Sequence, residues 1–156
     1  MSLGTLTLWL HITVIFTAIT ISYGPALLTE LAYRSGRVAT LRGVALASAP
    51  IARLIPVFYI TGGLFGLWTA INFGYNLLAP WLLIAYVLFA GAMITGIGFN
   101  SKFGPRLLAA TADAPDGPLT PEIVALFTDP RYRLVTTVDL FIVIAFLFDM
   151  VVKPFS

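Results

Sequence analysis

Four long and almost entirely apolar runs constrain this chain more than any other feature. They cover about residues 6–28, 51–73, 77–99 and 134–152, and about 20 apolar residues are enough to cross the hydrocarbon core of a bilayer. Inside lipid a segment must satisfy its own backbone hydrogen bonds, and continuously apolar runs do so as α-helices. We therefore predict a single all-α domain, an integral membrane four-helix bundle.

The basic residues set the expected orientation, because loops rich in Lys and Arg face the cytoplasm. We expect the loops at about 34–50 and 100–133 to be cytoplasmic. Both termini then lie outside, and the helices run antiparallel across a bacterial inner (plasma) membrane. Eight of the nine basic residues flank these two loops: Arg34, Arg37, Arg42, Arg53, Lys102, Arg106, Arg131 and Arg133.

The connections carry weaker signals. The first, YRSGRVATLRGVALASAP, predicts an interfacial helix under anionic headgroups, although the orientation rule alone accounts for its arginines. The sequence NFGYN at 72–76 predicts a tight hairpin between the second and third spans. The third connection opens with NSKFGPR and continues into ADAPDGP, a cluster of Pro, Gly and Asp that predicts a loop. It later contains a short helix that begins at Pro121 after a Thr120 cap.

Composition excludes several classes of protein. The chain is 59% hydrophobic and 10% charged, which is unlike a soluble domain. A net charge of +2, with its basic residues dispersed, argues against a nucleic-acid partner. The absence of cysteine removes disulfides and thiolate metal sites. The first 29 residues lack Lys and Arg, so we expect no cleavable signal.

The single histidine, His11, and Asp149 are expected at similar depths near the outer side. A carboxylate beside an imidazole would suit a haem ligand or a proton relay. However, Asp149 stands four residues before Lys153, a spacing typical of an ordinary pair on a helix. We favour an Asp149–Lys153 pair or a contact with interface water, and a His11 that packs through a hydrogen bond to a neighbouring helix. The alternative is a haem b- or quinone-associated redox site, with His11 as ligand and Asp149 behind it.

Metal and haem chemistry would need further ligands. The second axial position of a haem could stay open, or could be taken by Met93, Met150 or His11 of a second copy. A catalytic metal site needs about three converging ligands, and only His11 and Asp149 share a depth. We therefore predict neither a metal site nor a catalytic set.

Arg53 opens the second span and Asp139 lies early in the fourth, so both are expected near the cytoplasmic boundary. Their opposite charges predict an ion pair between helices that clamps the bundle, with a substrate-binding role as the alternative. Proline in the interior of a helix bends it, so we expect bends at Pro25 and Pro56.

Small residues predict where helices approach closely. We expect the second span to pack against the third through these residues. The hydroxyls at Thr13, Thr17, Thr20 and Ser22 could line a narrow polar path, but bonding to their own helix is the simpler expectation. The small-residue pairs are Gly62 with Gly66, Gly91 with Thr95, and Ala92 with Gly96.

Four stretches resemble a known family. They are LWLHITVIF in the first span, RLIPVFYITGGLFGLW opening the second, PWLLIAYVLF opening the third and DMVVKP closing the fourth. With them the chain resembles the DUF2269 family of small four-helix membrane proteins, which is distantly similar to CopD-like copper-resistance domains and HemJ-like protoporphyrinogen oxidases. The HemJ likeness implies that His11 is a haem ligand. The other histidine and polar positions of such an oxidase have no match here, and copper would lack ligands.

These observations favour a non-enzymatic polytopic membrane protein. Its partners are the lipid bilayer and either other membrane-protein subunits, for which it is an accessory or structural subunit, or further copies of itself in a homo-oligomer. The redox protein that uses His11 is the first alternative. A small transporter or channel, suggested by the hydroxyls of the first span, is the second.

Overall fold

The structure is a computed structural model that describes residues 1–154, apart from the side chain of Asn100. All regular elements of this described range are helical. In chain order they are α1 (Leu3–Arg34), α2 (Val38–Ala52), α3 (Ile55–Asn72), α4 (Pro80–Met93), the π-helical segment η1 (Ile94–Phe99), the 3₁₀ turn η2 (Asn100–Lys102), α5 (Phe103–Ala112), α6 (Pro121–Thr128) and α7 (Pro130–Val152).

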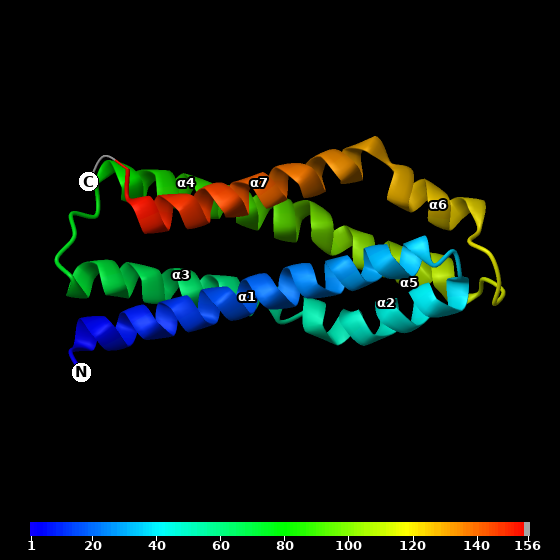
Figure 1. The fold of residues 1–156 in the computed structure, drawn as a ribbon, viewed down its shortest axis with the longest axis horizontal. Coiled ribbons are helices and arrows are strands. Elements are labelled where there is room, and N and C mark those ends of the chain that lie inside the picture. Colours follow the sequence, from blue (N-terminus) through cyan, green and yellow to red (C-terminus); the bar gives the residue numbers. More distant parts are fainter. Residues whose placement is uncertain (155–156) are drawn as a thin grey trace.

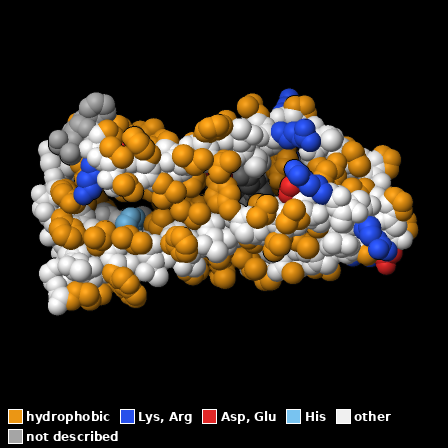
Figure 2. All heavy atoms as spheres, viewed as in Figure 1, with side chains coloured by type: hydrophobic (Ala, Val, Ile, Leu, Met, Phe, Trp, Pro, Cys, Tyr) orange, Lys and Arg blue, Asp and Glu red, His pale blue; other side chains and the backbone are white. Residues whose placement is uncertain are grey.

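Four helical stretches are long and apolar enough to cross a membrane, which confirms the predicted number of spans. They are Leu3–Arg34, Val38–Asn72, Pro80–Ala112 and Pro130–Val152. Their outward faces are apolar: Phe16 is 71% exposed and Val87 is 72% exposed, and Figure 2 shows hydrophobic side chains over most of the visible face. With 32 residues α1 is about 48 Å long, which exceeds the roughly 30 Å of the hydrocarbon core. α1 is therefore longer than the hydrocarbon core that it would cross.

The spanning helices form two pairs. Figure 1 shows α1 beside α3, and α4 beside α7. The second and third spans, α3 and α4, follow each other in the chain but barely touch, so the predicted tight hairpin is wrong. The connection between them occupies residues 73–79, which is long enough to separate the helices.

Two glycines explain why α3 packs on α1. A Cβ atom at Gly62 would lie 2.5 Å from Ile15 Cδ1, and one at Gly66 would lie 2.8 Å from His11 Cε1. Because glycine lets two backbones approach this closely, this face sets the α1–α3 contact. The prediction that Gly62 and Gly66 pack the second span on the third is therefore wrong, since their partner is the first span.

The other small-residue pairs divide. A Cβ at Gly91 would lie 3.3 Å from Ile142 Cδ1, so Gly91 packs α4 on α7. Thr95 contributes through its hydroxyl, as described below. Gly96, expected to pair with Ala92, has no described atom within 4 Å of the position that a Cβ would take. Its predicted role in packing within the bundle is not observed.

A compact cap lies at one end of the molecule, and α1 starts and α7 finishes at the other end (Figure 1). The cap consists of α2, α5 and α6. Arg42 fastens it by donating to the Thr111 carbonyl at 2.7 Å and to Asp116 Oδ1 at 2.9 Å. Thus α2, expected as an interfacial helix, packs along one face on α5 and α6. The segment NSKFGPR is helical, and the turns after it bury Leu107 in this cap. The loop predicted at ADAPDGP is confirmed from Asp113 on, between the end of α5 and the start of α6. The buried core consists of Ala32, Val38, Leu41, Ala45, Leu107, Ile123 and Phe127.

Prolines and caps account for the helix limits. Pro25 lies inside α1 as predicted. Pro56 lies in the first turn of α3, where proline is tolerated. The bend expected at Pro56 is therefore replaced by a break between α2 and α3 just before it. Thr120 caps α6 by accepting from the Ile123 amide at 3.4 Å, which confirms the short helix that starts at Pro121.

Candidate functional site

His11 is held by a hydrogen bond to a neighbouring helix. Its Nδ1 lies 2.8 Å from the carbonyl oxygen of Gly62 on α3. A carbonyl oxygen only accepts, so Nδ1 carries the proton and Nε2 is the nitrogen left available. The half-buried imidazole rests on Gly66, where a side chain would collide with it. This is the contact that the predicted packing role requires.

The other imidazole nitrogen faces open space. Nε2 of His11 makes no hydrogen bond with any described residue and is not buried. Figure 2 shows a hollow between the two helix pairs, toward the end where α1 starts, with the histidine on its wall. A ligand in this hollow could therefore reach Nε2 without disturbing the bond to Gly62.

Asp149 is buried without a partner. Asp149 is 2% exposed, and neither of its carboxylate oxygens has a hydrogen-bond partner within residues 1–154. The predicted pair with Lys153 is wrong, because α7 ends at Val152 and Lys153 takes a left-handed conformation with φ of 47°. The alternative hydrogen bond to His11 is not formed either.

Lys153 has a different partner near that end of the bundle. Its Nζ donates to the Tyr75 hydroxyl at 2.9 Å. The same ammonium lies 4.6 Å from the centre of the Tyr75 ring and 5.3 Å from the Trp81 ring. Aromatic faces attract cations at such distances. This attraction takes Lys153 away from Asp149.

Asp139 joins helices of both pairs. Asp139 is 8% exposed, and its Oδ2 accepts a hydrogen bond from the Tyr23 hydroxyl of α1 at 2.7 Å. Its Oδ1 accepts from the Thr95 hydroxyl in η1. The Thr95 hydroxyl also lies 3.0 Å from the Gly91 carbonyl, in α4. One carboxylate on α7 is thus tied to both α1 and the α4–η1 helix.

The predicted ion pair between Arg53 and Asp139 is wrong. Arg53 is exposed at the end of α2, and the two ion pairs found over the described range are Glu30–Arg34 and Arg42–Asp116. Hydroxyl groups occupy the places that the guanidinium was expected to fill. Sequence reasoning missed Tyr23, although a tyrosine at matching depth in the first span was the available signal.

Two more groups complete the Asp139 cluster, which we define as Tyr23, Tyr59, Thr95, Thr136 and Asp139. Tyr59 brings α3 to the edge of the cluster, since its hydroxyl lies beside that of Ser22, the residue before Tyr23 on α1. Thr136 lies one turn before Asp139 on the same face of α7, and its hydroxyl oxygen is buried with no partner in the described structure. All four spanning helices therefore contribute oxygen atoms to one region.

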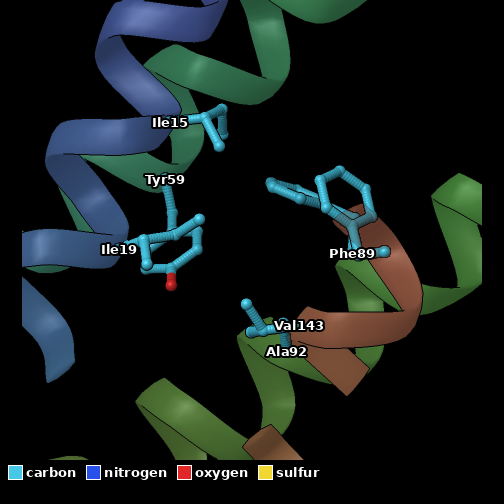
Figure 3. A pocket seen from close by; sticks show the side chains of 7 residues that line it. Ile15, Ile19, Tyr59, Phe89, Ala92 and Val143 are labelled. Carbon is cyan, nitrogen blue, oxygen red and sulfur yellow. The ribbon is translucent and has the colours of Figure 1, made fainter. Parts of the chain in front are cut away.

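An apolar layer separates the Asp139 cluster from the hollow beside His11. Figure 3 shows side chains of α1, α3, α4 and α7 directed toward one small cavity, with the Tyr59 ring at its border. The cavity has a volume of about 10 Å³, which is room for one water at most. It offers no continuous polar passage. Its lining residues are Ile15, Ile19, Tyr59, Phe89, Ala92, Val143 and Phe146.

The remaining candidate groups form no site. Thr17, Thr20 and Ser22 donate to carbonyls of their own helix at 2.8, 2.9 and 2.7 Å, as expected of hydroxyls that do not line a path. Across the described residues, no three His, Cys, Asp or Glu side chains converge as metal ligands would.

The fold and these contacts define a multi-pass helical membrane protein whose intramembrane polar groups connect its helices. No family model, curated protein or solved structure matches this chain.

Proposed function

We propose that the protein is a non-enzymatic accessory or structural subunit of a larger assembly in a bacterial inner membrane. One observation carries this proposal: the intramembrane polar groups with reactive potential mainly tie helices together. His11 ties α1 to α3, and Asp139 ties α7 to α1 and η1. Membership of the DUF2269 family of small four-helix proteins is part of the same proposal.

The surface offered to a partner lies on η1. Gly96 and Gly98 have open space where a Cβ would stand, and the flanking Ile94 and Phe99 are 61% and 57% exposed. Small residues between large apolar ones let a second transmembrane helix approach closely. A π-helical turn widens the helix locally and often marks a functional position. The partner is another membrane subunit or a second copy of this chain.

A large side chain in the open space at Gly98 is expected to break the assembly. In native membranes solubilised in mild detergent, the wild-type chain should migrate well above its 16.9 kDa mass, and Gly98→Leu should shift it to the monomer. Ala145→Leu, at another exposed small residue of a spanning helix, is the matched control. Migration as a monomer by the wild type, or an unchanged complex in Gly98→Leu, contradicts the proposal.

The same proposal places the cap in the cytoplasm and both chain termini outside. Since the chain has no cysteine, single cysteines report sidedness directly. A membrane-impermeant maleimide should label Asn76→Cys in intact cells and should label Asp113→Cys only after permeabilisation. Both positions are exposed. The reverse labelling pattern contradicts the orientation.

A second candidate function is a haem b-associated redox protein, and the hydrogen bond of His11 favours it. A ligating histidine needs its second nitrogen fixed by a hydrogen bond, and the Nδ1–Gly62 contact does this while Nε2 faces the hollow. Met150 packs against the buried cluster of Ala70, Trp81 and Leu82, and Ala70 lies one turn beyond Gly66 on α3. Met150 is therefore better placed than Met93 to approach the second axial position. These residues would hold the iron, which supplies one-electron chemistry.

Reconstitution with haem tests this second candidate. The purified wild type should acquire a Soret band, and His11→Ala should lose at least nine-tenths of it, because no other histidine can replace the ligand. Thr13→Ala, close to His11 on α1, is the control that should keep the band. An equal band in His11→Ala would show non-specific haem uptake and remove this candidate.

A further inference from the structure

We propose that the Asp139 cluster is a binding site for a dehydrated monovalent alkali cation, Na⁺ being the best fit. This site is independent of the assembly function proposed above. It rests on the kind of atoms that the four spanning helices bring together, on their net charge, and on one polar atom that the protein itself leaves unsatisfied.

The atoms of the cluster are oxygen throughout. They come from the carboxylate of Asp139 and from the hydroxyls of Tyr23, Tyr59, Thr95 and Thr136. Hard cations prefer oxygen ligands. A carboxylate has about four lone-pair directions and uses two for Tyr23 and Thr95, while a hydroxyl that donates one hydrogen bond keeps its own lone pairs. The existing hydrogen bonds therefore leave acceptors for a cation.

The hydroxyl of Thr136 is the second, separate observation. Other helical threonines here, such as Thr69 and Thr111, donate to the carbonyl four residues earlier. Thr136 makes no such bond, and its oxygen is buried beside Tyr132 with no hydrogen-bond partner among the described residues. A buried polar atom without a partner calls for a water or an ion. Thr136 stands three residues before Asp139, on the same helix face.

The charge of the cluster matches one monovalent ion. Asp139 is its one carboxylate, and the ion pairs found over the described range involve other residues. A carboxylate inside a membrane span is expensive unless a cation or a wet cavity accompanies it. A divalent ion would call for further carboxylates, and none converge here in the described chain. One positive charge neutralises the cluster.

The surroundings suit an ion that arrives from the cap side. Toward the other end of the bundle, Ile15, Phe89 and Phe146 close the cluster off with the apolar layer of Figure 3. Toward the cap, Tyr132 and Thr136 continue the polar face of α7, and Glu30 lies near Tyr132. Thr95 lies in the π-helical segment η1, and π-turns in helices often occur at functional positions. The apolar layer thus closes one side of the site.

Thermal unfolding of the full chain in detergent tests the site. The midpoint is measured at increasing NaCl, KCl and choline chloride, with ionic strength held constant. Because an ion that binds only the folded state stabilises it, saturating Na⁺ should raise the midpoint by about 5 °C relative to choline. Asp139→Asn should abolish this shift. Asp149→Asn, which changes the other buried carboxylate of α7, should retain it.

A second variant keeps the test decisive if Asp139→Asn fails to fold. Thr136→Val removes a hydroxyl that makes no hydrogen bond with any described residue, so the fold should survive. Its half-saturating Na⁺ concentration should rise at least ten-fold, whereas Thr137→Val, at the exposed neighbour, should match the wild type. The proposal is overturned if no alkali cation shifts the wild-type midpoint, if the shift persists in Asp139→Asn, or if Thr136→Val titrates like the wild type.

Discussion

Replacing Gly66 with alanine is expected to lower the unfolding midpoint in detergent by about 6 °C, or about 2 kcal/mol for a chain of this size. The new Cβ would lie 2.8 Å from His11 Cε1 and 3.0 Å from His11 Nδ1. Because the ring is held by Gly62, it cannot move aside without losing that hydrogen bond, which is worth about 1 kcal/mol. The effect opposes the higher intrinsic helix propensity of alanine.

A double-mutant cycle identifies the cause. In a His11→Ala background the collision is gone, so Gly66→Ala should become neutral or stabilising. Gly24→Ala is the matched control, since no described atom lies within 4 Å of the Cβ it would add. Destabilisation by Gly66→Ala of equal size in both backgrounds would show that His11 does not set the α1–α3 contact.

The number and approximate limits of the spans could be predicted because they depend on composition alone. Their pairing could not. Gly62 and Gly66 predict a face for close approach, but a small-residue face does not specify which helix it meets. Here Ile15 and His11 of α1 fill it. The third span follows directly in the chain, so it was the expected partner of this glycine face. The seven-residue connection between α3 and α4 is long enough for the two helices to lie apart.

The polar contacts show a similar limit. Charge and depth suggested Arg53 for Asp139, but an arginine at the end of a helix can reach water, and pairing inside the bundle would strip its hydration. Hydroxyls of Tyr23 and Thr95 lose less on burial and occupy the carboxylate instead. The partner of His11 is a backbone carbonyl, and residue types cannot reveal which carbonyl a helix crossing will present.

The cap was missed for a different reason. Prolines, glycines and aspartates in the third connection predict its loop, but they do not show that the apolar residues on either side of the loop pack together. Leu107 and Ile123 are buried against Val38 and Leu41 of α2. Their partners lie far away in the sequence, so local propensity does not reveal this packing.

The two buried carboxylates of α7 should respond to the same substitution with opposite signs. Asp149 has neither oxygen satisfied and is 2% exposed. A buried polar group without partners destabilises a fold by about 1–3 kcal/mol, and leucine has a similar branched shape. We therefore expect Asp149→Leu to raise the unfolding midpoint by about 6 °C.

Asp139→Leu should instead lower the midpoint by a similar amount, because it leaves the half-buried Tyr23 hydroxyl without its acceptor and breaks the bond to Thr95. Parallel melting curves of the two variants in one detergent decide the matter. Destabilisation by Asp149→Leu would show that its carboxylate has a stabilising partner. If Asp149→Leu is more stable yet loses the native assembly, the unsatisfied carboxylate is retained for function at the expense of stability.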